Sequence, residues 1–288
     1  MTSEPVTRST LVRGMAELGV GEGRTVLVHA SLSRFGYVVG GEHTVCLALE
    51  EALGPRGTIV MPGFSPQLVH PAAWRPARLN GADPGALADD MPSFDRASTP
   101  VAATIGVVAQ CLRAMPGTQR SAHPHTSFLA RGPEAEGIVT DHPLEYRLST
   151  LGPLGRLWAL DAVVLMLGVS WSKCTAIHIA EYSAPYPGRR QGRWPVPVTG
   201  HAGVRWVDVP ELLLWEGDFE RLGRDFEQAR PESVRRCRIG DADCVSASLR
   251  NLVRFAVRWL PAHRDLRGLA DPPGWSGVEP AAGVLPGA

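Results

Sequence analysis

The sequence is short of cysteine, of net charge and of long apolar runs. Its five cysteines form no C-x-x-C pair, so we expect neither a disulfide framework nor a thiolate metal site, and a reducing cytoplasm is the default location. The most apolar stretch, residues 162–169, is far too short to span a bilayer. Residues 1–11 lack the basic start and apolar core of a secretory signal. These absences predict a cytoplasmic protein that has no membrane partner.

Charge excludes a second class of partner. The 29 basic side chains equal the 29 acidic ones, whereas a surface built for nucleic acid needs a strong basic excess. We therefore expect no nucleic-acid partner, although a local charged pocket remains compatible with a neutral whole. The composition, 44% hydrophobic and 20% charged over 288 residues, is typical of a packed globular protein.

Three motifs of other α/β enzymes are also missing. The sequence contains no G-x-G-x-x-G, no G-x-x-x-x-G-K-[ST] and no G-x-S-x-G. These absences weaken the dinucleotide-binding, kinase and esterase interpretations.

What is present alternates between strand and helix patterns. Residues 25–29 and 57–61 read as strands on either side of a helix over 42–53, the order of a βαβ unit. The apolar run 162–169 predicts a central strand covered on both faces. Further helices are expected over 10–18, 105–115, 175–182 and 249–260, and a hairpin over 195–209. The fold class is thus α/β, with a few antiparallel additions.

Two stretches depart from this pattern. Residues 67–100 hold five prolines and few apolar runs, which predicts a long irregular excursion of the kind that is often functional. From Arg264 onward the chain is rich in proline, glycine and alanine. We expect a single domain over 1–263, with the excursion near the substrate, and a mobile tail over 264–288.

Ligands of α/β sheets bind where the strands end at their carboxyl edge, and the segment after 25–29 is one such place. It contains Ser31 and Ser33, whose small hydroxyl side chains let a ligand approach backbone N–H groups. An ordinary serine-rich turn explains them equally well.

A second segment runs from Arg120 to His125. Arg120 beside Ser121 suits capture of a phosphate or carboxylate. His123 and His125 are possible metal ligands, but the third ligand that a metal site needs is not evident nearby, so no metal is expected.

The third segment follows the most apolar strand and contains His178 and Glu181. Three residues apart on a helix, they share one face. A carboxylate beside an imidazole is what general-base catalysis requires. The alternative is a histidine buried in the core with its hydrogen bonds satisfied.

At these residues the sequence resembles a known family. The collinear stretches VLVHASLSRFGYVVGG (26–41), GTIVMPGFS (57–65), RSAHPHTSFLARGPEA (120–135) and VLMLGVSWSKCTAIHIAE (164–181) resemble the aminoglycoside 3-N-acetyltransferase family, which is distinct from the GNAT fold. The resemblance implies a three-layer α/β/α fold with a mixed, largely parallel sheet. It also implies that the protein is an acetyl-coenzyme A-dependent N-acetyltransferase that gives resistance to an aminoglycoside antibiotic. The resemblance covers most of residues 10–260.

The resemblance also assigns roles to residues. In catalysis it implies His178 with Glu181, and Thr175 near the thioester carbonyl. For coenzyme A it implies Ser31, Leu32, Ser33 and Gly36, together with Arg120 and Ser121, and for the aminoglycoside it implies Asp218. Because such an acceptor is polycationic, we expect an acidic cleft, with candidates in the excursion at Asp83, Asp89, Asp90 and Asp95.

Other functions stay open. One alternative is the same transferase with a different amine as its acceptor, such as kasugamycin or a biosynthetic intermediate. A metal-dependent hydrolase using His29, His123, His125 and His178, or a non-catalytic coenzyme A binding module, fits the residues less well. A monomer and a homodimer are both compatible with the sequence.

Overall fold

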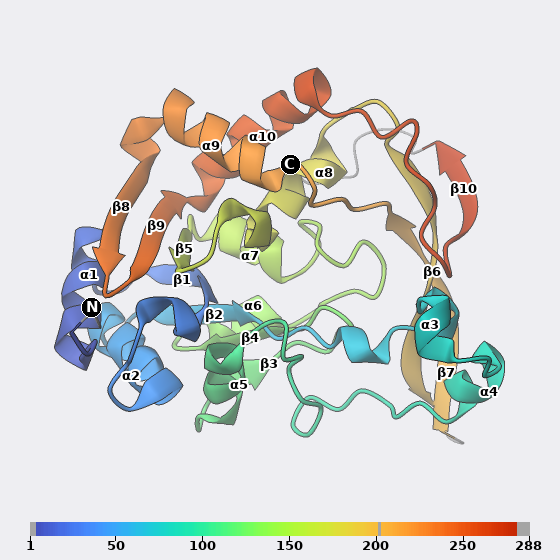
Figure 1. Ribbon diagram of the computed structural model, residues 1–288, viewed down its shortest axis with the longest axis horizontal. Coiled ribbons are helices and arrows are strands. Elements are labelled where there is room, and N and C mark those ends of the chain that lie inside the picture. The colour runs from blue at the N-terminus through green and yellow to red at the C-terminus, as the bar shows by residue number, and fades with distance from the viewer. Residues whose placement is uncertain (1–3, 201–202, 281–288) are drawn as a thin grey trace.

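A computed structural model describes residues 4–200 and 203–280. At its centre lies a seven-stranded sheet in the order β3-β4-β2-β1-β5-β9-β8 (Figure 1). β1 (Thr25–Ala30) pairs in parallel with β2 (Thr58–Pro62) on one side and β5 (Val163–Leu167) on the other. The outer strands run antiparallel: β3 (Gln119–Arg120), β4 (Phe128–Arg131), β8 (Val234–Ile239) and β9 (Ala242–Ser248). The expected mixed sheet, parallel at its core with antiparallel additions, is confirmed.

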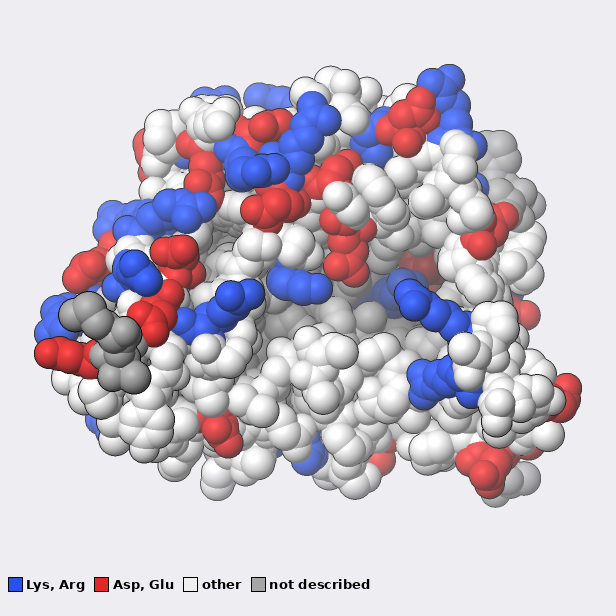
Figure 2. Space-filling model, viewed as in Figure 1, with Lys and Arg blue, Asp and Glu red and all other residues white. Residues whose placement is uncertain are grey.

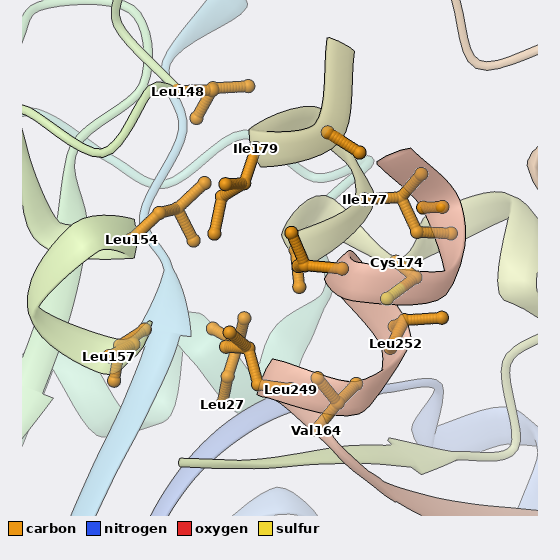
Figure 3. Close-up of a cluster of buried hydrophobic side chains, with 14 of the residues drawn as sticks. Leu27, Leu148, Leu154, Leu157, Val164, Cys174, Ile177, Ile179, Leu249 and Leu252 are labelled. Atoms are coloured by element: carbon orange, nitrogen blue, oxygen red, sulfur yellow. The ribbon is translucent and has the colours of Figure 1, made fainter. Parts of the chain in front are cut away.

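Side chains alternate between the two faces of this sheet, and helices cover both. Val26 and Val28 of β1 pack under α1 (Arg8–Glu17), α2 (Gly41–Leu53) and α5 (Val107–Ala114). Leu27 points to the other face, which Figure 3 shows in close-up with Val164 and Leu249. That face is covered by α6 (Ala135–Val139), α7 (Pro153–Ala159), α8 (His178–Ser183), α9 (Phe219–Ala229) and α10 (Leu249–His263). The period of two along β1 thus produces the three-layer α/β/α arrangement.

The predicted βαβ unit is confirmed as β1, α2 and β2. The second strand was predicted over 57–61, and in the structure β2 lies one residue further along and ends at Pro62. The ladder between β1 and β2 stops at Val60, and Pro62 pairs only with Phe128 of β4. Its missing N–H therefore interrupts no bond to β1.

The excursion over 67–100 is mostly irregular but contains two short helices, α3 (Pro76–Leu79) and α4 (Pro84–Asp89). It lies against a second sheet, β10-β6-β7, at the right of Figure 1. Trp206 of β7 meets the ring of His70 at 4.5 Å and donates a hydrogen bond to the carbonyl of Ala88 at 3.2 Å. The expected hairpin is present as β6 (Arg190–Gly200) and β7 (Gly203–Leu212), longer than predicted.

Residues 264–280 differ from the expected mobile tail. Arg264 is buried, the N–H of Leu266 bonds to the carbonyl of Pro187 at 2.9 Å, and β10 (Ser276–Pro280) pairs with β6. These partners are distant in sequence, so the local composition of proline and glycine does not reveal them. Residues 281–288 of the expected tail lie outside the described residues.

Within the described ranges, no helix is long and apolar enough to cross a membrane. All five cysteines are free, including Cys237 and Cys244, which face each other across β8 and β9.

Candidate active site

A cavity of about 900 Å³ opens where the three parallel strands end. His29 and Ala30 of β1 line it, with Pro62 of β2 and Val169 just after β5. Ala30 pairs with Leu167, so the loops that follow β1 and β5 begin side by side. Figure 2 shows a hollow across the middle of this face, bordered by basic and acidic side chains. The volume and the position are those of a small-molecule site in an α/β fold.

Large apolar side chains remain exposed at this cavity. Tyr37 is 70% exposed and Val107, at the start of α5, is 51% exposed, and both line the cavity. Exposed apolar groups gathered at a hollow are typical of a ligand site.

The imidazole of His178 lies in the cavity wall at the start of α8. The sequence predicted a helix over 175–182; the structure has a 3₁₀ turn over Thr175–Ile177 that leads into α8. His178 Nδ1 bonds to Glu181 Oε2, and the His178 ring meets that of Phe219 edge-on at 5.0 Å. A carboxylate only accepts, so Nδ1 carries the hydrogen and Nε2 keeps its lone pair.

Glu181 is completely buried and fully bonded. Its Oε1 accepts from the backbone N–H of Trp215 at 2.9 Å and from the guanidinium of Arg264. Arg264 in turn donates through Nε to Asp218 Oδ2 at 2.9 Å. Burial opposes the charge of Arg264, but the hydrogen bond and charges of Asp218 and Glu181 outweigh it, so its pKa lies above the ordinary value.

Thr175 and Cys174 line the cavity on the approach to His178. Both are buried. Burial raises the pKa of the Cys174 thiol to about 12, so this sulfur stays a neutral thiol and is a poor nucleophile at pH 7.

His29 is a second imidazole in the cavity wall. Its Nε2 is buried and has no hydrogen-bond partner in the described part of the chain. Burial, followed by Coulomb repulsion between the protonated forms of His29 and His178, lowers the pKa of His29 to about 3. His29 is therefore neutral at physiological pH.

The four residues predicted for the coenzyme A loop all line the cavity. The structure brings together Ser31, Leu32, Ser33 and Gly36. An adjoining cavity of about 550 Å³ shares Ser31 with it and adds Arg34, Gly168 and Arg236. Lys173, the only lysine of the chain, lines both cavities; sequence reasoning missed it because a lone lysine gives no pattern.

Arg120 and Ser121, the other two residues predicted for coenzyme A, are not among the residues that line the cavity. Arg120 is buried and donates to Ser127 Oγ at 2.9 Å and to the carbonyl of Gly63 at 2.6 Å. Ser121 Oγ bonds to His142 Nδ1 at 2.9 Å. Arg120 thus holds the turn after β2 through Gly63, whereas Ser121 links β4 to the segment at His142.

The predicted acidic residues also lie away from the lining. Asp83 caps α4 through the N–H of Ala86 at 2.8 Å, and Asp90 ends the same helix, both exposed. Asp218 pairs with Arg264. Among the described residues that line the cavity, Glu216 is the one carboxylate.

His123 uses both of its ring nitrogens in hydrogen bonds. His123 Nδ1 accepts from the N–H of His125 at 3.1 Å and from that of Thr126 at 3.2 Å, which leaves its Nε2 to donate to the carbonyl of Leu144 at 3.1 Å. Neither nitrogen then has a free lone pair for a metal. Across residues 4–200 and 203–280, no group of three or more histidine, cysteine, aspartate or glutamate side chains is placed to hold a metal ion.

This arrangement defines a class of enzyme. A deep cavity at the strand ends, with an imidazole whose free nitrogen is set by a buried carboxylate, suits the removal of a proton from a bound nucleophile. The chain belongs to the aminoglycoside 3-N-acetyltransferase family, whose model matches residues 27–261. It is therefore an acyltransferase.

Curated and solved relatives agree with this. The chain is 39% identical to aminoglycoside N(3)-acetyltransferase VIII of Streptomyces fradiae, over 89% of this chain and 92% of that one. It is similar to the crystal structure of YokD from Bacillus subtilis, with a TM-score of 0.83, 33% identity and coverage of 91% and 96%. It is also similar to AAC-IIIb in a binary complex with CoASH, with a TM-score of 0.77, 30% identity and coverage of 92% and 99%.

Proposed function

We propose that the protein transfers the acetyl group of acetyl-coenzyme A to an amino group of an aminoglycoside. The observation that carries this is the position of His178: its ring lines the cavity while Nδ1 is bonded to buried Glu181. The AAC-IIIb structure with CoASH and the names of the curated relatives support the choice of donor and acceptor.

In this proposal His178 is the general base for direct transfer. The acceptor nitrogen, as a free amine, attacks the thioester carbonyl carbon and passes a proton to His178 Nε2. The tetrahedral intermediate then collapses, the C–S bond breaks, and the departing thiolate takes that proton to leave as free coenzyme A. Glu181 stabilises the imidazolium between the two steps. Thr175, with backbone N–H groups, stabilises the oxyanion.

The donor extends from His178 across the loop after β1. Ser31, Ser33 and Gly36 allow close approach of the pantetheine arm, and Tyr37 offers an exposed ring at the mouth. Arg34 and Lys173 are both exposed cations on the adjoining wall. We assign them to the phosphates of coenzyme A, since guanidinium and ammonium groups bind phosphate oxygens through charge-assisted hydrogen bonds.

A different amine is the second candidate acceptor. Glu216 is the one carboxylate among the described lining residues, whereas a polycationic aminoglycoside favours several. An amine with fewer positive charges, such as a biosynthetic intermediate or an atypical aminoglycoside like kasugamycin, fits that lining better.

A substrate panel tests the function. The enzyme is incubated with acetyl-coenzyme A and either polycationic aminoglycosides, kasugamycin or simple amines, and both thiol release and the position of the added acetyl group are measured. Acetylation of a 2-deoxystreptamine amine supports the first acceptor class, and turnover only of amines with fewer charges supports the second. If the protein binds the thioester but releases no thiol with any amine, both proposed acceptor classes are wrong.

Resistance and location follow from the same proposal. If an aminoglycoside is the acceptor, expression in a susceptible bacterium raises its inhibitory concentration, and the His178→Ala variant does not. We place the reaction in the cytoplasm, where acetyl-coenzyme A is available, and the five free cysteines agree with that. We also propose one catalytic domain over 1–263, extended by the packed segment that begins at Arg264.

A further inference from the structure

Arg264 is the first residue after α10, and its side chain is completely buried. The guanidinium bonds on one side to Glu181 and on the other to Asp218, with Nη2 also donating to the carbonyl of Trp215 at 3.0 Å. The rings of Tyr186 and Phe219 lie 5.1 and 5.7 Å from its central carbon. The whole fork is therefore held in one position.

The fixed guanidinium of Arg264 holds the carboxyl group of Glu181 in one orientation. Its Oε1 is held by Arg264 and by the N–H of Trp215, while its Oε2 is left for His178 Nδ1. With each oxygen committed to its own partners, the carboxyl group cannot rotate without breaking bonds on both sides. The orientation of the His178 ring, and the nitrogen that carries its hydrogen, are thereby fixed.

Charge leads to the same residue. Glu181 is buried without solvent contact, and a buried carboxylate lacking a cationic partner is strongly destabilised. Without Arg264, the carboxyl group would have to bind a proton or leave its position. Either change removes the acceptor that orients His178 Nδ1.

We propose that Arg264 is a positioning residue for acyl transfer, which acts by fixing Glu181 against His178. Asp218, expected at the acceptor site, holds Arg264 in place instead. The inference rests on the proposed function of His178 as the general base.

A purely structural role for Arg264 makes a different prediction, and the chain offers a matched control. Arg190 anchors the same segment, donating through Nε to Asp271 at 2.9 Å and through Nη1 to the carbonyl of Leu266 at 3.2 Å. Its side chain bonds to Asp271 and to the carbonyls of Leu266 and Leu269, and none of these bonds goes to Glu181 or His178. Arg190→Gln therefore loosens the segment without touching the proposed pair.

The experiment compares Arg264→Gln, Arg264→Lys and Arg190→Gln in the full-length enzyme, measuring kcat and KM for acetyl-coenzyme A by thiol release, and Tm by thermal unfolding. We expect Arg264→Gln to lower kcat by about 10- to 100-fold, the range seen when an orienting partner is lost, with KM for acetyl-coenzyme A unchanged. Arg264→Lys should recover part of kcat. Arg190→Gln should lower Tm and keep kcat.

Two further variants keep the inference falsifiable if Arg264→Gln does not fold. Asp218→Asn keeps the guanidinium but weakens its anchor, and should lower kcat by about threefold to tenfold. In a Glu181→Gln background, Arg264→Lys should change kcat no further, because the carboxylate on which it acts is gone.

The failures are distinguishable. If His178→Ala keeps full turnover, the proposed role of His178 as the general base fails. If His178→Ala abolishes turnover but Arg264→Gln and Asp218→Asn keep kcat, or Arg190→Gln lowers kcat as much as Arg264→Gln does, only the role of Arg264 is overturned.

Discussion

The Nδ1 atom of His178 bonds to Oε2 of Glu181 inside the first turn of α8, and both side chains are buried. The two residues are close in sequence. The cavity beside them, however, is lined by residues of β1, β2, α5 and the segment after β5. The reactivity of one imidazole thus depends on elements from across the fold.

Loss of that imidazole should stop the reaction without unfolding the protein. If His178 is the general base as proposed, we expect His178→Ala to lower kcat by about 10²- to 10⁴-fold, the usual contribution of such a group. The measurement is thiol release at saturating acetyl-coenzyme A, with Tm recorded in parallel. His43→Ala, at an exposed histidine of α2, is the control and should match the wild type. An unchanged kcat in His178→Ala would mean that another group takes the proton.

The basic wall should set the affinity for the donor. Lys173→Gln combined with Arg34→Gln removes two exposed cations at the cavity, and we expect KM for acetyl-coenzyme A to rise by about tenfold with little change in kcat. That corresponds to about 1.4 kcal/mol, a modest value because salt and water screen exposed charges. Arg56→Gln, on the exposed pair with Glu22, should leave KM unchanged. Equal KM values in all three proteins would place the phosphates elsewhere.

The pair of His178 and Glu181 and the loop after β1 were predictable because their sequence signals are local. His178 and Glu181 are three residues apart on one helix, and Ser31 and Ser33 follow a strand directly. The sequence also predicts the layers, since strand and helix periods are local properties. Arg264 was not predictable: its partner Glu181 is 83 residues away, and the surrounding composition resembles a tail.

Two other residues show the same limit. Asp218 was expected at the acceptor site, and nothing in the sequence indicates that its carboxylate pairs with Arg264. Arg120 was expected to bind an anion, but its N–H groups donate hydrogen bonds to Ser127 and to two backbone carbonyls. Residue type predicts what a group can bind, whereas only the packed fold decides which partner it meets.

Buried histidines should make the protein sensitive to mild acid. Burial lowers the pKa of His29 and of His125 to about 3 and that of His142 to about 4. In the unfolded chain these groups bind a proton near pH 6.5. Between pH 6.5 and 4 the unfolded state therefore binds more protons, and the free energy of unfolding falls as pH falls. Each such group contributes a slope of up to about 1.4 kcal/mol per pH unit.

Urea unfolding between pH 7.5 and 4.5 measures this slope. His125→Gln removes one titrating group and should reduce this slope by about 1.4 kcal/mol per pH unit. The fold should be kept, because the amide can still donate to the carbonyl of Leu68 as Nε2 of His125 does. His43→Gln, at an exposed site, should leave the slope unchanged. A free energy of unfolding that stays constant from pH 6.5 to 4.5 would show that these rings are protonated in the folded state.

The close contact between Gly223 of α9 and Trp171 should be important for stability. A Cβ added to Gly223 would lie 2.0 Å from Cγ of Trp171, and Trp171 begins the turn that leads to Lys173 and Thr175. Alanine is the better helix former by about 1 kcal/mol, but the overlap forces either the indole or the helix to move. We expect Gly223→Ala to lower the free energy of unfolding by about 1–3 kcal/mol, the usual range for overpacking.

Gly223→Ala should also lower the rate of the reaction. A shift of Trp171 moves the segment before His178, and a misplacement of about 1 Å can slow a reaction by about 10²-fold, so kcat/KM of the folded variant should fall by at least about fivefold. Gly137→Ala is the matched control: it lies in α6, its new Cβ meets no atom within 4 Å, and it should stabilise the protein while leaving kcat/KM unchanged. Gly223→Ala with wild-type stability and turnover would mean that α9 and Trp171 adjust to each other without disturbing the wall of the cavity.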